Sequence, residues 1–208
     1  MGPPERLAIE RISEDRPDLV APLADWILEA GEPYYSRLFG DRETALGTIR
    51  RWMTRSSSEI ALKRVHLVSL EGSVAGGFVA LDGSELARAR KADLIALTVD
   101  PDPGRAQALR ERLSALKGLF GQIEPQEYYL SKMFLAARFR GTNLSRQLLK
   151  AYLAEGQLRG YGRFALDVHA DNSRAIRSYS RAGFWISART SSADGTVRYL
   201  SMKYEVSR

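Results

Sequence analysis

The chain has 208 residues, of which 44% are hydrophobic, so it is long enough for one sizeable core and a little short for two. The absence of cysteine excludes disulfides, thiolate nucleophiles and cysteine-based zinc sites, and two histidines at unrelated spacing, His66 and His169, leave no credible metal cluster. The formal net charge is +6, and residues 138–189 alone hold ten Arg or Lys against three Asp or Glu, which favours a compact anionic ligand there over a nucleic-acid surface.

These properties predict a single cytoplasmic, metal-free domain over residues 1–208. No apolar run approaches the ~18 residues of a membrane span. A solvated, arginine-rich surface would account for the charge equally well, so charge alone leaves both interpretations open.

The first quarter of the chain predicts one strand and two helices. Residues 6–13 alternate apolar and polar side chains, which is typical of a strand. Helical spacing follows over about 17–30 and 33–55, and Gly40 is a candidate break in the second helix. The side chains expected to point inward from the strand are Leu7, Ile9 and Ile12.

The middle of the chain predicts a hairpin and then a helical insertion. Two apolar segments, 65–70 and 74–81, are joined by a short turn, and the pair at 76–77 (Gly-Gly) hints at a bulge or a close backbone approach. Residues 84–124 have helical spacing in two pieces, split at 100–104 by Asp-Pro-Asp-Pro-Gly. We expect an insertion within the same domain.

The last third of the chain alternates strands and helices. A strand over 128–135 leads through a basic loop into a helix over 144–158. A strand over 164–168, a short helix over 173–181 and a final hairpin around 193–195 complete the predicted elements.

The basic loop has the chemistry of an anion site. A loop that leads from a strand into a helix exposes unpaired N–H groups at the positive end of the helix dipole, so it can bind pyrophosphate. Gly141 allows the backbone to approach closely, and Arg138, Arg140 and Arg146 can contact phosphate oxygens. The chain lacks both the nucleoside-triphosphate motif Gly-x-x-x-x-Gly-Lys-Ser/Thr and the dinucleotide motif Gly-x-Gly-x-x-Gly.

Residues 140–145 read RGTNLS and are similar to the acetyl-CoA loop Arg/Gln-x-x-Gly-x-Gly/Ala of the GCN5-related N-acetyltransferase (GNAT) superfamily. Asn143 and Ser145 replace the two later glycines of the common form of that loop. Asn tolerates left-handed backbone geometry better than most residues, and Ser keeps its N–H group, so we expect an altered loop that still binds.

A second motif carries the more specific resemblance. The family pattern Asn-x-x-Ala-Ile-x-x-Tyr-x-x-x-Gly-Phe matches residues 172–184, and the preceding acidic position, Glu in most members, is Asp167. The resemblance is close over residues 128–205 and loose over the whole chain, and the insertion departs from the usual short connection. On spacing alone, Tyr179 would more often be a half-buried helix aromatic; the surrounding motif favours a functional role.

The resemblance implies a GNAT-like α/β fold, with a mixed, mostly antiparallel sheet of about six to seven strands, flanking helices and the insertion between strands 3 and 4. It also implies acetyl-CoA as cofactor. Tyr179 would lie near the thioester sulfur as proton donor. The implied cofactor-binding residues are Met133, Phe134, Leu135, Arg140, Gly141, Thr142, Asn143, Leu144, Ser145, Arg146, Asn172, Ala175 and Ser178.

The implied reaction is acetyl transfer from acetyl-CoA to a primary amine by direct attack in a ternary complex. An alkylamine is mostly protonated at neutral pH, so a base should accept its proton, and Glu127 ranks marginally ahead of Asp167 for that role. Glu32, Tyr34 and Tyr35 are candidate acceptor contacts, although aromatic residues at such positions are more often core.

Two other functions compete with this hypothesis. The altered loop and the uncertain base suggest a catalytically silent acyl-CoA-binding module, and a pI near 9.7 suggests a nucleic-acid binder, which the localised charge argues against. We expect a small-molecule or peptide amine as partner, and neither nucleic acid nor membrane. The sequence leaves open the acceptor's identity and whether the protein forms a homodimer.

Overall fold

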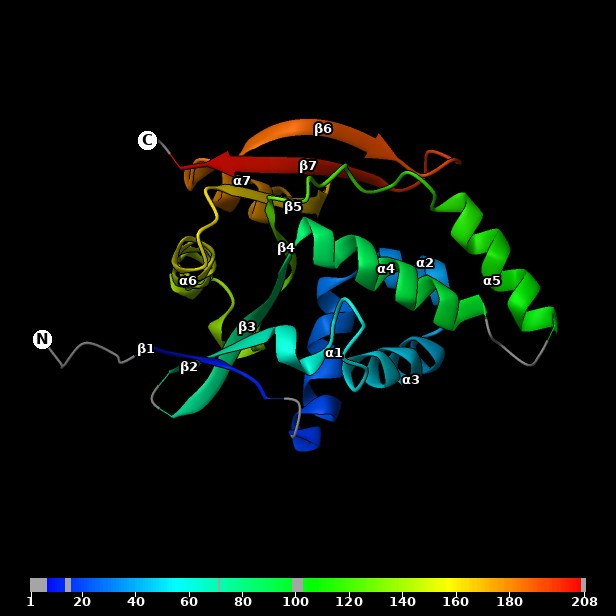
Figure 1. Ribbon diagram of the computed structural model, residues 1–208, viewed down its shortest axis with the longest axis horizontal. Coiled ribbons are helices and arrows are strands. Elements are labelled where there is room, and N and C mark those ends of the chain that lie inside the picture. The colour runs from blue at the N-terminus through cyan, green and yellow to red at the C-terminus, as the bar shows by residue number, and fades with distance from the viewer. Residues whose placement is uncertain (1–6, 14–15, 71, 99–102, 207–208) are drawn as a thin grey trace, which may run out of the picture.

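The computed structural model describes residues 7–13, 16–70, 72–98 and 103–206, and Figure 1 shows an open sheet with helices on both sides. The sheet has seven strands in the order β1-β2-β3-β4-β5-β7-β6. All neighbouring strands are antiparallel except β4 and β5, which are parallel. The predicted mixed, mostly antiparallel sheet is therefore confirmed. The strands are β1 (Leu7–Arg11), β2 (Val65–Leu70), β3 (Ser73–Asp82), β4 (Tyr128–Leu135), β5 (Arg163–His169), β6 (Trp185–Ser191) and β7 (Arg198–Glu205).

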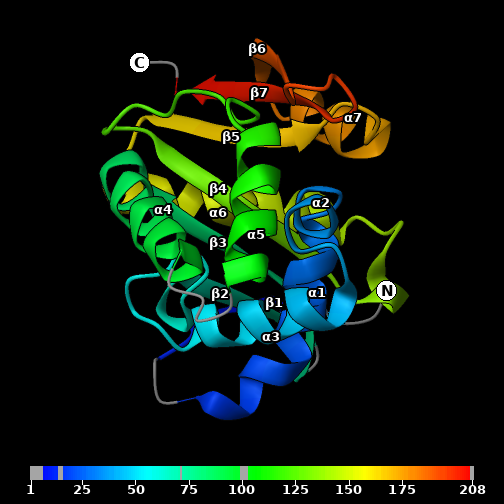
Figure 2. The same ribbon diagram turned by 90° about the vertical axis from the view of Figure 1, so that its right-hand side faces the viewer.

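The helices divide between the two faces of the sheet (Figures 1 and 2). On one face α6 and α7 cover a cluster that is rich in aromatic side chains, including Phe78, Tyr128 and Phe164. On the other face α1 to α5 pack against strand side chains next in sequence to those of the first cluster, such as Val79 and Tyr129. This follows because successive side chains of a strand point to opposite faces of the sheet. The helices are α1 (Val20–Ala30), α2 (Tyr34–Phe39), α3 (Arg42–Met53), α4 (Gly83–Thr98), α5 (Pro103–Ala115), α6 (Leu144–Leu158) and α7 (Ser173–Arg181).

The predicted break near Gly40 is confirmed. Gly40 has a φ of +87°, a conformation that residues with a side chain rarely adopt, and it ends α2. One residue later Asp41 caps α3, where its carboxylate accepts a hydrogen bond from Thr44 N at 2.8 Å. The chain therefore turns between two helices where the sequence allowed one.

The first strand is shorter than predicted, and one of the side chains predicted to be buried is exposed. Ile12 is buried as expected, but Ile9 is 47% exposed. Ile9 pairs with Val68 of β2, and α6 covers Val68 without reaching the edge strand beyond it. Residues 1–6 and the Leu7 side chain lie outside the described part of the chain.

The hairpin and the insertion follow the prediction. A Cβ atom on Gly77 would lie 2.5 Å from the His66 carbonyl oxygen, so β2 and β3 approach closely there, and their register shifts beside Gly76. The insertion between β3 and β4 forms α4 and α5. Of the predicted break at 100–104, positions 100–102 lie outside the described residues. Every helix in the described ranges is too short or too polar to cross a bilayer.

Candidate active site

The site begins where β4 and β5 separate. In the described part of the chain their ladder covers three residue pairs, of which the last is Leu130 with Leu166. Beyond it, β4 stays paired with β3 as far as Leu135, while its other edge faces a cavity of about 320 Å³, here called the β4–β5 cavity. The backbone groups along that edge can therefore bond a ligand that lies there like an added strand.

The β4–β5 cavity gathers residues that are far apart in the sequence. They come from α1, β4, the basic loop, β5 and α7, which are brought together by the separation of the two parallel strands. Of the predicted site residues, those that line it are Glu32, Met133, Phe134, Leu135, Arg140, Gly141, Ser145, Asp167, Asn172, Ala175, Ser178 and Tyr179.

The basic loop forms a tight turn ahead of α6. Gly141 has a φ of +91°, so the left-handed position of the loop is Gly141, whereas Asn143 is right-handed with a φ of −71°. The tolerance of asparagine for left-handed geometry is therefore not used at Asn143. Thr142 Oγ1 donates to the Phe139 carbonyl at 2.7 Å and accepts from Leu144 N at 3.2 Å. Leu144 itself is buried beneath the loop.

Basic side chains gather beside this loop, between α6 and α7. They line a further cavity of about 760 Å³, here called the α6–α7 cavity, to which Thr142, Asn143, Ser145 and Ser178 also contribute. Since phosphate oxygens are matched by guanidinium groups, this cavity can hold the phosphates of a polyanionic ligand. The basic residues that line it are Arg146, Lys150, Arg174, Arg177 and Arg181.

Asn172 and Tyr179 are placed by the same short helix. The Asn172 side chain accepts a hydrogen bond from Ala175 N at 3.1 Å and so begins α7, and Tyr179 lies two turns later on the wall of the β4–β5 cavity. Burial raises the pKa of Tyr179 to about 12. Its phenol is therefore neutral at physiological pH and holds a proton that it can donate.

The two predicted candidates for the base have different surroundings. Asp167 lines the β4–β5 cavity and accepts three hydrogen bonds: Oδ1 from Ser201 Oγ and from Gly121 N at 3.1 Å, and Oδ2 from the Tyr129 hydroxyl at 3.0 Å. Glu127 is 1% exposed, and its carboxylate lies 2.7 Å from Nζ of Lys203. Glu127 lines neither the β4–β5 cavity nor the cavity that adjoins it.

The adjoining cavity, here called the insertion cavity, has a volume of about 690 Å³. Side chains of α4 and α5 form much of its wall, and Tyr34 and Tyr35, the predicted acceptor contacts, line it. The wall that it shares with the β4–β5 cavity is made of Ala30, Ser131, Lys132, Asp167 and Tyr199. The two cavities therefore adjoin at this shared wall.

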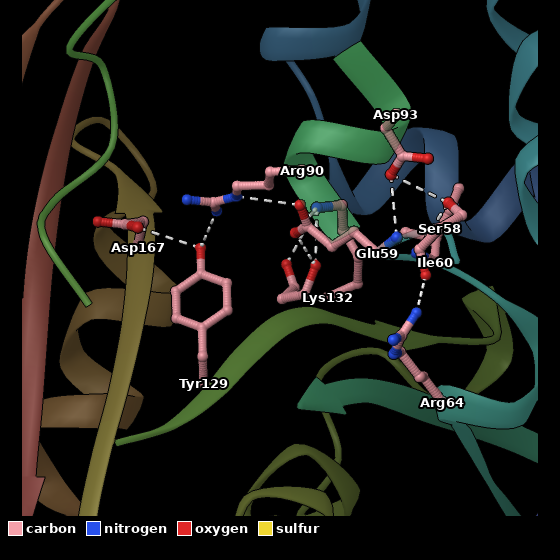
Figure 3. Close-up of polar contacts among 10 residues, drawn as sticks. Ser58, Glu59, Ile60, Arg64, Arg90, Asp93, Tyr129, Lys132 and Asp167 are labelled. Atoms are coloured by element: carbon pink, nitrogen blue, oxygen red, sulfur yellow. Dashed lines mark hydrogen bonds and ion pairs between the residues drawn. The ribbon is translucent and has the colours of Figure 1, made fainter. Parts of the chain in front are cut away.

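A partly buried polar cluster lies along the insertion cavity (Figure 3), and the sequence did not reveal it. Arg90 Nε donates to Glu59 at 3.0 Å, and Arg90 Nη2 donates to the Tyr129 hydroxyl at 3.1 Å. Tyr129 in turn donates to Asp167, so the cluster reaches the shared wall. Burial acts to raise the pKa of Glu59, but the cations of Arg90 and Lys132 outweigh it and lower that pKa to about 2.

Two observations connect the chain to known proteins. A sequence profile described as the acetyltransferase (GNAT) family matches residues 23–184. An N-acetyltransferase structure from Staphylococcus aureus Mu50 is similar with a TM-score of 0.71 and 15% identity, over 95% of this chain and 100% of that chain. The NatC complex bound to Gag peptide and CoA is similar with a TM-score of 0.57 and 12% identity, over 97% of this chain and 99% of that chain.

Identities this low show a shared fold only, and no curated protein is similar enough in sequence to count as a relative. The profile match is the stronger finding because it spans well over half of the chain and includes both predicted motifs. The chain therefore belongs to the GNAT family of acetyltransferases, whose donor is acetyl-CoA.

Proposed function

We propose that the protein transfers the acetyl group of acetyl-CoA to a primary amine, by direct attack while both are bound. The observation that carries this proposal is the shared wall, because it joins one cavity with cofactor chemistry to a second cavity of substrate size. The acceptor would enter the insertion cavity and present its amine beside Asp167.

The residues of the β4–β5 cavity fit the cofactor. The free edge of β4 at 133–135 can hydrogen-bond the amide groups of a pantetheine arm, and the N–H groups of the loop at 140–145 can bind pyrophosphate. The basic side chains of the α6–α7 cavity would neutralise the remaining phosphate charge. Bound acetyl-CoA supplies an activated acyl thioester at the shared wall.

Two residues of the chain would handle the protons of the reaction. Tyr179 would donate to the sulfur that leaves, because its raised pKa keeps the phenol neutral until a thiolate develops beside it. Asp167 is the carboxylate at the shared wall, so we assign to it the role of the base that accepts the proton of the amine. Its three hydrogen bonds occupy Oδ1 twice and Oδ2 once, so Oδ2 keeps one site that can accept this proton directly or through water. Glu127 is left as an internal partner of Lys203.

Thiol release from acetyl-CoA with a panel of amines tests this function. Tyr179→Phe should lower kcat about 100-fold or more while the Kd for CoA is unchanged, because only the proton donor is lost. Tyr204→Phe is the matched control, since Tyr204 packs in the same cluster and does not line the cavity. Binding of CoA without turnover for any amine would instead identify a silent acyl-CoA-binding module.

A further inference from the structure

Asp93 of α4 has an unused hydrogen-bond acceptor. The residue is 6% exposed and lines the insertion cavity. Its Oδ2 accepts from Ser58 Oγ at 3.0 Å and from Glu59 N at 2.9 Å, as Figure 3 shows. Its Oδ1 is buried and has no partner within the described part of the chain. Buried carboxylate oxygens are normally bonded, so this one calls for an explanation.

The unpaired oxygen is costly to the protein by itself. Burial, with a smaller contribution from the nearby Glu59 carboxylate, raises the pKa of Asp93 to about 6, against the hydrogen bonds from Ser58 and Glu59 N and the charge of Arg55. Asp93 also occupies an inward position of the α4 stripe, four residues from each of the apolar residues Ala89 and Leu97. An apolar residue there would avoid the cost, which points to a use for the charge.

Other cations around the insertion cavity do not satisfy this oxygen. Arg90, one turn earlier in α4, is bonded to Glu59 and Tyr129. Lys132 donates to Ser131 and lies 4.0 Å from the Glu59 carboxylate. Arg110 and Lys117 line the cavity from exposed positions at its rim. Asp93 is thus a buried acid of the cavity lining, and none of these cations satisfies its Oδ1.

Asp93 is also separate from the reacting end of the site. It lines the insertion cavity but not the β4–β5 cavity, and Figure 3 places it across the polar cluster from Asp167. The wall of the insertion cavity as a whole is mainly aromatic and aliphatic, and aromatic faces attract cations and pack against alkyl chains. The rings and aliphatic chains of that wall include Tyr34, Tyr35, Trp52, Leu94, Leu97 and Phe120.

We propose that Asp93 Oδ1 binds a second cationic group of the acceptor, so that the acceptor is a diamine-type molecule with two amino or guanidino groups on a mostly apolar spacer. This inference rests on the proposed function, because the first amine is the one that receives the acetyl group at the shared wall. The second amine stays charged and selects the substrate, which makes Asp93 a specificity-determining residue.

The test uses a series of α,ω-diaminoalkanes and n-alkylamines of the same chain lengths. Calorimetric titration with CoA present should show the preferred diamine binding to the wild type about tenfold or more tightly than its matched monoamine. Asp93→Asn should abolish that preference, since the amide keeps an oxygen for Ser58 and Glu59 N but loses the charge. Glu111→Gln, the same change at an exposed site of the insertion, should keep it.

The outcomes separate this proposal from the proposed function. Equal affinity of the wild type for diamines and monoamines, or a preference that survives Asp93→Asn, overturns the role of Asp93. An Asp93-dependent preference without thiol release from acetyl-CoA supports the cation site and overturns the acetyltransferase function. The pH dependence of binding to the wild type is an independent test. The preference for diamines over monoamines should shrink as the pH falls below about 6, where Asp93 becomes protonated and loses its charge.

Discussion

At the scale of single residues, the two glycines that flank α6 allow the contribution of the basic loop to ligand binding to be distinguished from its contribution to stability. Gly141 and Gly160 have nearly equal φ angles, +91° and +87°, but only Gly141 lines the β4–β5 cavity. Alanine at either position should cost about 1–2 kcal/mol of stability, because the left-handed conformation strains a Cβ atom. Only at Gly141 would that atom also crowd Arg174, 3.2 Å from its guanidinium.

Gly141→Ala should therefore weaken CoA binding, whereas Gly160→Ala should lower only the free energy of unfolding. Urea unfolding measures the second quantity in both variants, and calorimetric titration with CoA measures the first. An equal loss of CoA affinity in both variants would mean that the loop is not the binding element. Unchanged affinity in both would lead to the same conclusion.

Local motifs allowed some site residues to be predicted and left others hidden. Asn172 and Tyr179 lie seven residues apart on one helix, so their spacing alone places them together. Glu59, Arg90 and Lys132 come from a loop, the insertion and β4, and only the tertiary fold brings them into contact.

At the scale of elements, α6 positions the loop because it is seated tightly on the sheet. A Cβ atom on Gly156 would lie 2.3 Å from a ring carbon of Phe164 and 2.7 Å from one of Tyr128. The helix is also tied to the sheet by the Tyr152 hydroxyl, which donates to the Tyr128 carbonyl at 2.5 Å. Glycine is thus needed at position 156 for close packing, although it weakens a helix.

Gly156→Ala should destabilise the protein by about 1–3 kcal/mol, because overpacking outweighs the gain in helix propensity. Gly47→Ala in α3 is the matched control: nothing lies within 4 Å of its added Cβ atom, so it should stabilise by about 0.5–1 kcal/mol. Urea unfolding measures both changes. A stabilised Gly156→Ala would show that α6 can move away from the sheet, against the seating described here.

The elements themselves were largely predictable, because strand and helix periods are local properties of the sequence. The hairpin, the insertion and the helix after the basic loop all form where the pattern placed them. The exposure of Ile9 could not be predicted, since it depends on how far α6, more than a hundred residues later, extends across the sheet.

At the scale of the whole molecule, the Arg90–Glu59 pair links the insertion to the body of the fold. Arg90 belongs to α4, Glu59 precedes β2, and the Tyr129 hydroxyl that Arg90 also contacts belongs to β4. Arg90 further lies over the Phe120 ring, 5.1 Å from its centroid. Arg90 and Glu59 both line the insertion cavity, so the loss of this partly buried ion pair should affect stability and acceptor binding together.

Arg90→Met should lower the free energy of unfolding at pH 7 by about 3–5 kcal/mol, because it leaves the Glu59 carboxylate buried without its main partner. Glu59→Leu should cost a similar amount by leaving Arg90 unpaired. The double variant should lose much less than the sum, since an apolar pair replaces the ion pair. Urea unfolding of all four proteins measures this coupling, and additive losses would contradict it.

The same pair predicts how stability depends on pH. The pKa of Glu59 is lowered to about 2 from its ordinary 4.5, so the carboxylate binds a proton less readily in the folded state than in the unfolded chain. The stabilisation is therefore complete above about pH 4.5 and is lost as the pH falls through about 2. The double variant lacks the carboxylate and should lose less stability than the wild type between pH 5 and pH 3 in urea unfolding. Equal losses in the two proteins would mean that other carboxylates govern acid unfolding and that the Glu59 pair holds the insertion in place without setting the acid limit of the fold.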